Sequence, residues 1–278
     1  MHDSKHPVFH SPNNVDAKIW RFIDIQKFWS LLERESLHFS KVTSFEDPFE
    51  GRIAEYNKKM GREMYSTIRD KFETDEKFEK FLITRLKSFE ELYHTAKNFT
   101  LVNCWHLNEY ESASMWRLYS TNNSGIAIQS TYTKLTQSFQ NTPDKVYVGT
   151  VSYTDFTKEW MDESNVYAPF MYKRKSFENE QELRCVTVLP DDDSKTRVLS
   201  DLDKEREKIT PSKPKIVDPN ELTINGKFVK VNLDELIENI YIAPLSSNEF
   251  ENMVNSLTEK LRPNLSKKIQ KSDLYTVR

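Results

Sequence analysis

Short apolar runs of strand length recur along this chain and alternate with segments of helical spacing. Runs with the composition of buried strands occur near residues 18–22, 37–40, 99–102, 124–130 and 183–189. Segments with apolar residues three or four positions apart separate several of them, as expected of amphipathic helices. Strands that are distant in sequence and separated by helices assemble into a sheet with helices packed on it. The sequence therefore predicts an α+β fold, a single domain with a mixed sheet flanked by helices.

The domain limits follow from changes in composition. We expect residues 1–16 to form a loose N-terminal lead-in and residues 17–278 to form the single α+β domain. Charged, helix-favouring residues at about 53–97 predict two amphipathic helices, which form a helical insertion. A long loop is expected at about 191–219, because this stretch is rich in proline and aspartate and poor in apolar residues. We also expect a helix over 160–175.

Composition excludes several classes of protein. The 278 residues include only 5 glycines, and neither of the glycine-rich phosphate-binding motifs occurs. The net charge of −3 is too balanced to indicate a non-specific nucleic-acid binder. With 2 cysteines and no His-Glu-x-x-His motif, we predict no metal site. No apolar run approaches membrane-spanning length, so we expect a cytoplasmic protein that does not enter a membrane.

The segment from Cys104 to Trp116 holds the densest set of chemically capable side chains. It follows an apolar, strand-like run and precedes a helical pattern, so its polar residues lie at a junction between a strand and a helix. Junctions of this kind often carry binding or catalytic residues, because a rigid scaffold holds them. We expect Trp105 and Trp116 to be anchors and His106, Asn108 and Glu109 to form one wall of a cleft.

A second set of residues is spread along the chain. Arg21 lies on the first predicted strand, Ser40 ends the second, and Glu180-Gln181-Glu182 opens a later strand. This order resembles that of mono-ADP-ribosyltransferases, although the Ser-Thr-Ser of that family is absent. The resemblance implies a split sheet and NAD as substrate, with Arg21 on phosphate, Ser40 near the ribose and Glu182 as the catalytic carboxylate.

The Glu-x-Glu pattern is common in this chain, since it also occurs at 33/35, 109/111, 178/180, 205/207 and 249/251. Only the pair at 180 and 182 is followed at once by a clear apolar strand. An ordinary ion pair between Arg21 and Glu182 at the sheet edge is therefore an equally reasonable interpretation.

A wider set of motifs is similar to that of a bacterial family of uncharacterised proteins. The resemblance spans roughly residues 18–275 and is carried by Trp20-Arg21-Phe22, Leu37-His38-Phe39-Ser40, Phe45-Glu46-Asp47-Pro48-Phe49-Glu50-Gly51, Cys104-Trp105-His106-Leu107-Asn108-Glu109-Tyr110-Glu111-Ser112, Lys173-Arg174-Lys175-Ser176-Phe177 and Glu182-Leu183-Arg184. The family has no established activity, so the resemblance supplies no chemistry. It implies an effector encoded among mobile or defence genes.

Together these patterns predict an enzyme that acts on a nucleotide by ADP-ribosyl transfer from NAD or by NAD hydrolysis. Two alternatives stay open: a nuclease or nucleic-acid-binding effector that uses His106, Glu109 and Glu111 with the basic run 173–175, and a non-catalytic interaction module. Partners are a nucleotide or small-molecule substrate and a protein or nucleic-acid acceptor. The predicted site comprises, as catalytic residues, Glu182, His106 and Glu109; as cofactor-binding residues, Arg21, Ser40, Glu180, Arg174 and Arg184; and as cleft-lining residues, Asp47, Glu50, Arg52, Trp105, Asn108 and Glu111.

Overall fold

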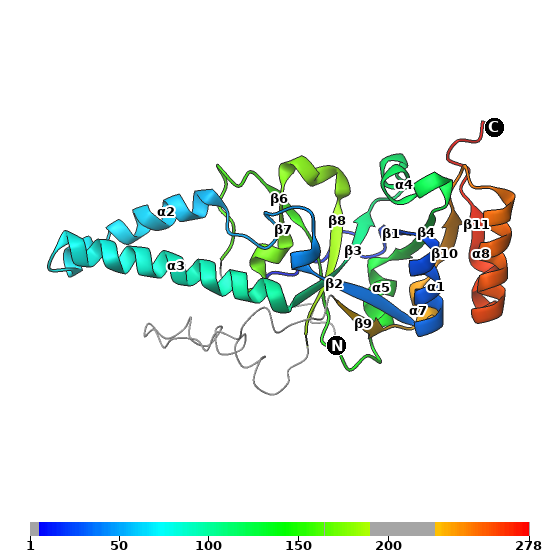
Figure 1. Ribbon diagram of the computed structural model, residues 1–278, viewed down its shortest axis with the longest axis horizontal. Coiled ribbons are helices and arrows are strands. Elements are labelled where there is room, and N and C mark those ends of the chain that lie inside the picture. Colours follow the sequence, from blue (N-terminus) through cyan, green and yellow to red (C-terminus); the bar gives the residue numbers. More distant parts are fainter. Residues whose placement is uncertain (1–5, 164, 190–225, 278) are drawn as a thin grey trace.

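A computed structural model describes residues 6–163, 165–189 and 226–277 of the chain. It shows a single domain in which a mixed sheet is flanked by helices, as the sequence predicts, with a long helical arm to one side (Figure 1). The predicted loop at about 191–219 lies outside the described residues. No helix among those described is both long enough and apolar enough to cross a membrane.

The elements follow one another in the alternating order that the apolar runs predict. The strands are β1 (Lys18–Ile23), β2 (Ser36–Lys41), β3 (Thr100–Leu107), β4 (Ile126–Thr131), β5 (Tyr147–Thr150), β6 (Ser152–Thr154), β7 (Tyr172–Arg174), β8 (Glu182–Val188), β9 (Gly226–Lys230), β10 (Asn239–Ile242) and β11 (Ile269–Lys271). The α-helices are α1 (Ile25–Arg34), α2 (Glu55–Ser66), α3 (Asp75–Phe99), α4 (Ala113–Tyr119), α5 (Tyr132–Ser138), α7 (Leu233–Leu236) and α8 (Asn248–Leu261). Side chains cap several helices. Asp24, for example, accepts a hydrogen bond from the Lys27 amide at the start of α1.

The large sheet forks at β3. One edge of β3 pairs with β8 from Thr100 to His106, and β8 in turn pairs with β5. The opposite edge is shared by two strands, β2 beside Leu101 and Val102 and β1 beside His106 and Leu107. One arm of the fork continues as β4, β10 and β11, and the other as β9. Residues 103–105 therefore face the gap between β1 and β2.

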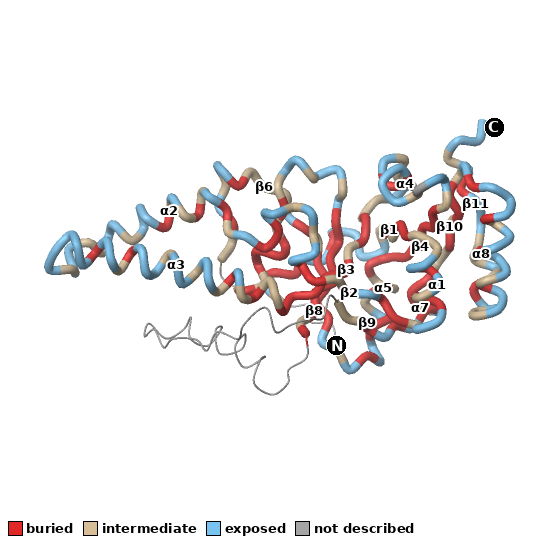
Figure 2. The backbone as a smooth tube through the Cα atoms, in the orientation of Figure 1, coloured by how far each residue is buried: buried red, intermediate tan, exposed pale blue. Residues whose placement is uncertain are grey.

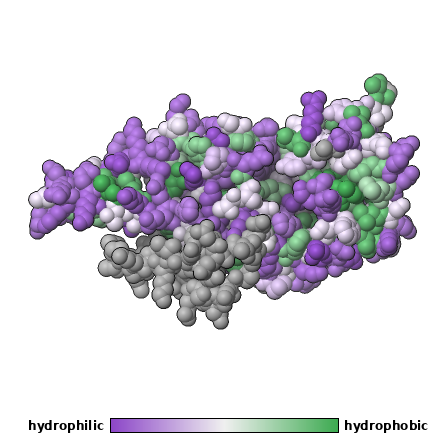
Figure 3. Space-filling view, in the orientation of Figure 1, coloured by the Kyte–Doolittle hydropathy of each residue, from purple (hydrophilic) through white to green (hydrophobic). Residues whose placement is uncertain are grey.

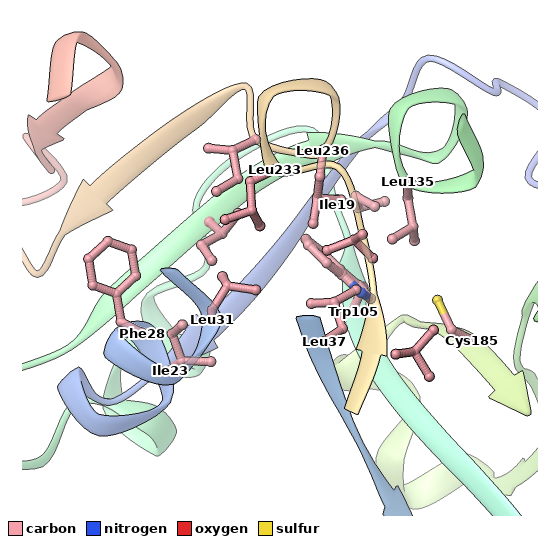
Figure 4. Close-up of a cluster of buried hydrophobic side chains, with 14 of the residues drawn as sticks. Ile19, Ile23, Phe28, Leu31, Leu37, Trp105, Leu135, Cys185, Leu233 and Leu236 are labelled. Atoms are coloured by element: carbon pink, nitrogen blue, oxygen red, sulfur yellow. The ribbon is translucent and has the colours of Figure 1, made fainter. Parts of the chain in front are cut away.

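The main core lies between one face of this sheet and four helices. Apolar side chains of α1, α5, α7 and α8 meet strand residues such as Ile19, Leu37 and Trp105, all of them buried (Figure 4). On the opposite face, α4 packs on Trp20 and Phe22 of β1. The end of α3 and the segment 166–171 cover the part near β8. Figure 2 shows that the buried residues gather in the sheet and in the elements that cover it.

Helices α2 and α3 form the arm, and they confirm the predicted pair of amphipathic helices. Figure 2 shows mostly exposed backbone along the arm, and Figure 3 shows mainly hydrophilic side chains over it. Near its tip, the Phe72 ring contacts the rings of Phe78 and Phe81. Closer to the sheet, Lys58 of α2 pairs with Glu90 of α3 at 2.7 Å. The arm is therefore held by its own contacts over much of its length.

Two expectations about local structure are wrong. The described residues of the stretch 160–175, which are 160–163 and 165–175, do not form an α-helix. They form a short 3₁₀ turn over Ala168–Met171 and the strand β7, and Pro169, which has no backbone N–H, disfavours an α-helix running through this position. The described part of the lead-in is not loose, because Phe9 is buried and stacks on Tyr147 at a centroid distance of 4.8 Å.

Candidate functional site at the sheet fork

A small pocket opens where the sheet forks. Its volume of about 60 Å³ is room for a few water molecules or one small chemical group. The pocket is lined by β1, β3, α4 and the start of β8, through Trp20, Arg21, Phe22, Cys104, Trp105, His106, Met115, Tyr119, Glu180 and Glu182. Segments far apart in sequence thus bring a guanidinium, an imidazole and two carboxylates to one place.

Arg21 lies on β1, and its guanidinium lies at the point where β1 and β2 diverge along the edge of β3. The backbone polar groups of Phe99 and Leu107 point to the edge of β3 that pairs with β8. The Leu107 amide donates to the Gln181 carbonyl, and the Phe99 carbonyl accepts from the Leu189 amide. Carbonyls alternate along a strand, so the Cys104 carbonyl points to the other edge, into the gap between β1 and β2. The Arg21 Nη1 donates to that carbonyl at 2.9 Å. The structure records no carboxylate partner for Arg21 among the described residues, and burial lowers the pKa of its guanidinium.

Glu182 is held by two cations. Lys173 Nζ donates to its Oε1 at 2.7 Å, and Arg184 Nε donates to its Oε2 at 2.5 Å. Burial alone would raise the pKa of Glu182, but Arg184 and Lys173 outweigh burial and hold the pKa well below its usual range. The carboxylate stays ionised, and its orientation is fixed at both oxygens.

Behind this carboxylate lies a buried ion-pair network. The Arg184 side chain is 0% exposed and the Glu50 side chain 1%, and two nearly parallel bonds of 2.8 and 2.9 Å join them. Arg184 also donates to the Phe170 carbonyl at 2.7 Å. Glu50 reaches this place from the turn that ends at Gly51. A Cβ on Gly51, whose φ is +65°, would lie 2.4 Å from the Phe170 ring.

Glu180 differs from Glu182 although both contact the same ammonium group. Lys173 Nζ donates to Glu180 Oε2 at 2.6 Å. Burial, and then contact with the Glu182 carboxylate, raises the pKa of Glu180 to about 7. Burial works against the charge of Lys173, but Glu182 and Glu180 outweigh it and raise the Lys173 pKa. Two carboxylates whose environments move their pKa values apart are suited to different chemical roles.

His106 is tied to the same segment. Its Nδ1 lies 2.6 Å from the Glu180 carbonyl, and its Nε2 lies 3.4 Å from Asn108 Nδ2. Burial lowers the pKa of the imidazole, which favours the neutral form. Burial also raises the pKa of the Cys104 thiol far above its usual range. This argues against a role for Cys104 as a nucleophile beside His106.

The structure brings together five of the predicted site residues, namely Arg21, Trp105, His106, Glu180 and Glu182, in the pocket. Arg184 and Glu50 support Glu182 from behind, and Asn108 contacts His106. These placements leave the chemical roles of the residues as predictions.

Other predicted site residues lie elsewhere. Ser40, on β2, pairs with Val102 of β3 and does not line the pocket. Glu109 and Arg52 are exposed. Glu111 accepts from Trp116 and Ser272, and so fastens α4 to the C-terminal segment. Asp47 accepts from Arg174 at 2.9 Å.

The basic run 173–175 is neutralised by neighbouring carboxylates. Lys173 contacts Glu180 and Glu182, Arg174 contacts Asp47, and Lys175 contacts Glu159. Little of its positive charge is therefore available for a nucleic-acid backbone. Among the described residues, no group of three or more His, Cys, Asp or Glu side chains could hold a metal ion.

Sequence reasoning did not assign five of the pocket residues to the site, namely Trp20, Phe22, Cys104, Met115 and Tyr119. Met115 and Tyr119 reach the pocket because α4 packs on β1, and their spacing indicated only a helix face. The link between Glu180 and His106 was also missed, since a side-chain bond to a backbone carbonyl has no sequence signal.

Residues 115–185 match the model of a family described as "Protein of unknown function (DUF2971)". The matched span, well under half of the chain, runs from α4 to β8 and includes Tyr119, Glu180 and Glu182 of the pocket. Over this span the chain is similar to an uncharacterised family. No match was found among curated proteins or solved structures. The resemblance to mono-ADP-ribosyltransferases stays a prediction.

Proposed function

We propose that the pocket at the fork is the active site of an enzyme that breaks the bond between nicotinamide and ribose in NAD. The released ADP-ribosyl group passes to an acceptor or to water. The observation that carries the proposal is that Glu180 and Glu182, with pKa values moved in opposite directions, line the same small pocket as Arg21.

Each carboxylate has a distinct task in this reaction. When the glycosidic bond breaks, its electron pair leaves with nicotinamide and positive charge develops on the ribose. Glu182 stays ionised and can stabilise that charge, because Lys173 and Arg184 fix its position in advance. An acceptor hydroxyl or water then bonds to the ribose carbon, and Glu180, whose pKa is about 7, takes its proton.

Arg21 supplies the positive charge for the phosphates. Its guanidinium has spare donors, because the Cys104 carbonyl takes one of them and a guanidinium has five. The pocket of about 60 Å³ admits only the reacting end of a dinucleotide, so the remainder would lie outside, beside the exposed ring of Tyr119. Ser40 has no part in this proposal, since it lies outside the pocket.

The test is nicotinamide release from NAD by the purified chain, followed by chromatography. We expect release by the wild type and a loss of about 10²–10³-fold in Glu182→Gln, the usual cost of losing a preorganised electrostatic group. Glu180→Gln should also lose activity. Glu178→Gln is the matched control, because Glu178 is exposed and two residues upstream. Absence of release by the wild type, or equal release by all three variants, would reject the proposal.

A second candidate, a non-catalytic interaction module, is supported by the pairing of Glu50, Lys173, Glu182 and Arg184. A network with this degree of burial and pairing can serve the fold alone. In that case Arg21, Glu180 and Glu182 variants change stability, and NAD is neither bound nor consumed.

A further inference from the structure

Gln181, between the two carboxylates, has a left-handed backbone conformation, with φ 41° and ψ 56°. This conformation is uncommon for a residue other than glycine, and surrounding contacts must hold it. An extended residue here would continue β8 and carry Glu180 along the strand, away from Glu182. The turn instead lets both carboxylates accept from Lys173 Nζ, at 2.6 and 2.7 Å.

The end of β3 holds this turn through two bonds. The Leu107 amide donates to the Gln181 carbonyl at 2.8 Å. His106 Nδ1 lies 2.6 Å from the Glu180 carbonyl, which can only accept, so Nδ1 carries the proton. The backbone bond forms whatever residue occupies 107, whereas the second bond depends on the side chain at 106.

The surroundings of His106 select the required tautomer. With the proton on Nδ1, Nε2 is an acceptor, and it lies 3.4 Å from the Asn108 side-chain amide, which is a donor. The backbone of Asn108 is in turn held, because Trp20 Nε1 donates to the Asn108 backbone carbonyl at 2.8 Å. His106 is itself 3% exposed, so water offers little competition for these bonds.

We infer that His106 is a positioning residue: it clamps the left-handed turn at Gln181 and thereby keeps Glu180 and Glu182 together on Lys173. The clamp deepens the proposed function, on which it rests only for the chemical role of Glu180. The clamp also connects the Trp-Arg-Phe segment with the Cys-Trp-His-Leu-Asn segment. Trp20 donates to the Asn108 backbone, the Asn108 side chain contacts His106, and His106 contacts the Glu180 carbonyl.

Glu180 titration reports on the clamp because it depends on the nearby Glu182. The titratable and charged groups around Glu180 are Lys173 on β7, Glu182 and Arg184 on β8, Glu50 in the turn before α2, Tyr119 on α4, Tyr153 on β6, His106 and Cys104 on β3 and Arg21 on β1. If the turn relaxes, Glu180 moves away from Glu182 and toward solvent. Its titration then approaches that of an ordinary glutamate.

The experiment is a carboxyl ¹³C NMR titration of glutamate-labelled protein, with the Glu180 signal assigned by its loss in Glu180→Gln. We expect a wild-type midpoint near pH 7, as for the pKa of about 7. In His106→Leu, which removes the donor, the midpoint should fall by at least one unit. In His106→Asn, whose amide can donate from near the Nδ1 position, it should stay near the wild-type value. An unchanged midpoint in folded His106→Leu overturns the inference.

Two further measurements keep the test decisive. Gln181→Gly should leave the midpoint unchanged, because glycine accepts the left-handed conformation without strain; a large fall would assign the turn to the Gln181 side chain instead. If His106→Leu does not fold, the ¹⁵N spectrum of the wild-type imidazole decides, since a proton on Nε2 rather than Nδ1 overturns the clamp. None of these measurements uses NAD, so a chain that releases no nicotinamide can still show the clamp.

Discussion

Arg184 is the residue whose loss we expect the fold to tolerate least. Its guanidinium is fully buried and bonds to Glu50, Glu182 and the Phe170 carbonyl. Arg184→Leu would leave those carboxylates buried with Lys173 as their remaining cation. Removing one partner of a buried pair typically costs about 3–5 kcal/mol. Urea unfolding followed by circular dichroism should show a loss of this size.

The control for Arg184 is Lys175→Met. Lys175 also forms an ion pair, with Glu159, but its side chain is 53% exposed. Exposed pairs contribute about 0–1 kcal/mol, so this variant should unfold close to the wild type. Equal losses in the two variants would show that burial of the Arg184 network does not govern its stability.

The sequence singled out several residues that the structure places in the pocket, but it did not give their geometry. Position before an apolar strand singled out Glu180 and Glu182 among several Glu-x-Glu pairs, and the structure places both in one pocket with Arg21. Ser40 could not be placed in the same way. It lies two strands from Arg21 in the sheet order, on the other side of the fork. The sequence does not show where a strand divides its edge between two neighbours.

Secondary structure could be predicted where periodicity was long and marked by caps. In α8 (Asn248–Leu261), apolar residues at helical spacing follow the cap residue Ser247, which accepts a hydrogen bond from the Phe250 amide. The prediction of a helix over 160–175 was wrong because aromatic residues at irregular spacing suit several conformations. Its form is set by tertiary contacts, such as the two bonds between Asn57 of α2 and the Met161 backbone.

The helical arm formed by α2 and α3 extends away from the sheet (Figure 1). Its distal part contributes nothing to the main core, and the two helices are adjacent where the Cβ position of Gly61 lies 3.6 Å from Leu86. We expect replacement of residues 62–85 by a short Gly-Ser linker to leave a folded domain with a similar melting temperature. Loss of cooperative melting would mean that the distal arm helps to stabilise the sheet.

For the whole molecule, Glu180 should make stability depend on pH. Its pKa is about 7 in the folded chain and near 4.5 as an ordinary glutamate, so between these values the folded state binds the proton more strongly. Stability contributed by this proton is present at low pH and is lost as pH rises from about 4.5 to 7. The wild type should therefore lose stability across this window relative to Glu180→Gln.

Denaturant unfolding of both proteins at several pH values would measure that difference. A constant difference between the wild type and Glu180→Gln from pH 4.5 to 7.5 would contradict the raised pKa. Glu182 has a lowered pKa, so its own contribution is lost as pH falls, in the opposite direction. Comparison of the two proteins separates these trends, because both contain Glu182.

The fork at β3 also means that the pocket cannot form until late in the synthesis of the chain. Arg21 and Glu182 are separated by roughly 160 residues, which a ribosome adds in about 8–32 s at ordinary rates. Until β8 emerges, one edge of β3 lacks its partner, and Glu50 and Lys173 cannot pair with Arg184 and Glu182. Formation of the pocket is therefore a late event in the life of each nascent chain. A raised titration midpoint of Glu180 would therefore show that β1 and β3, which are synthesised early, have assembled with β8, which is synthesised late.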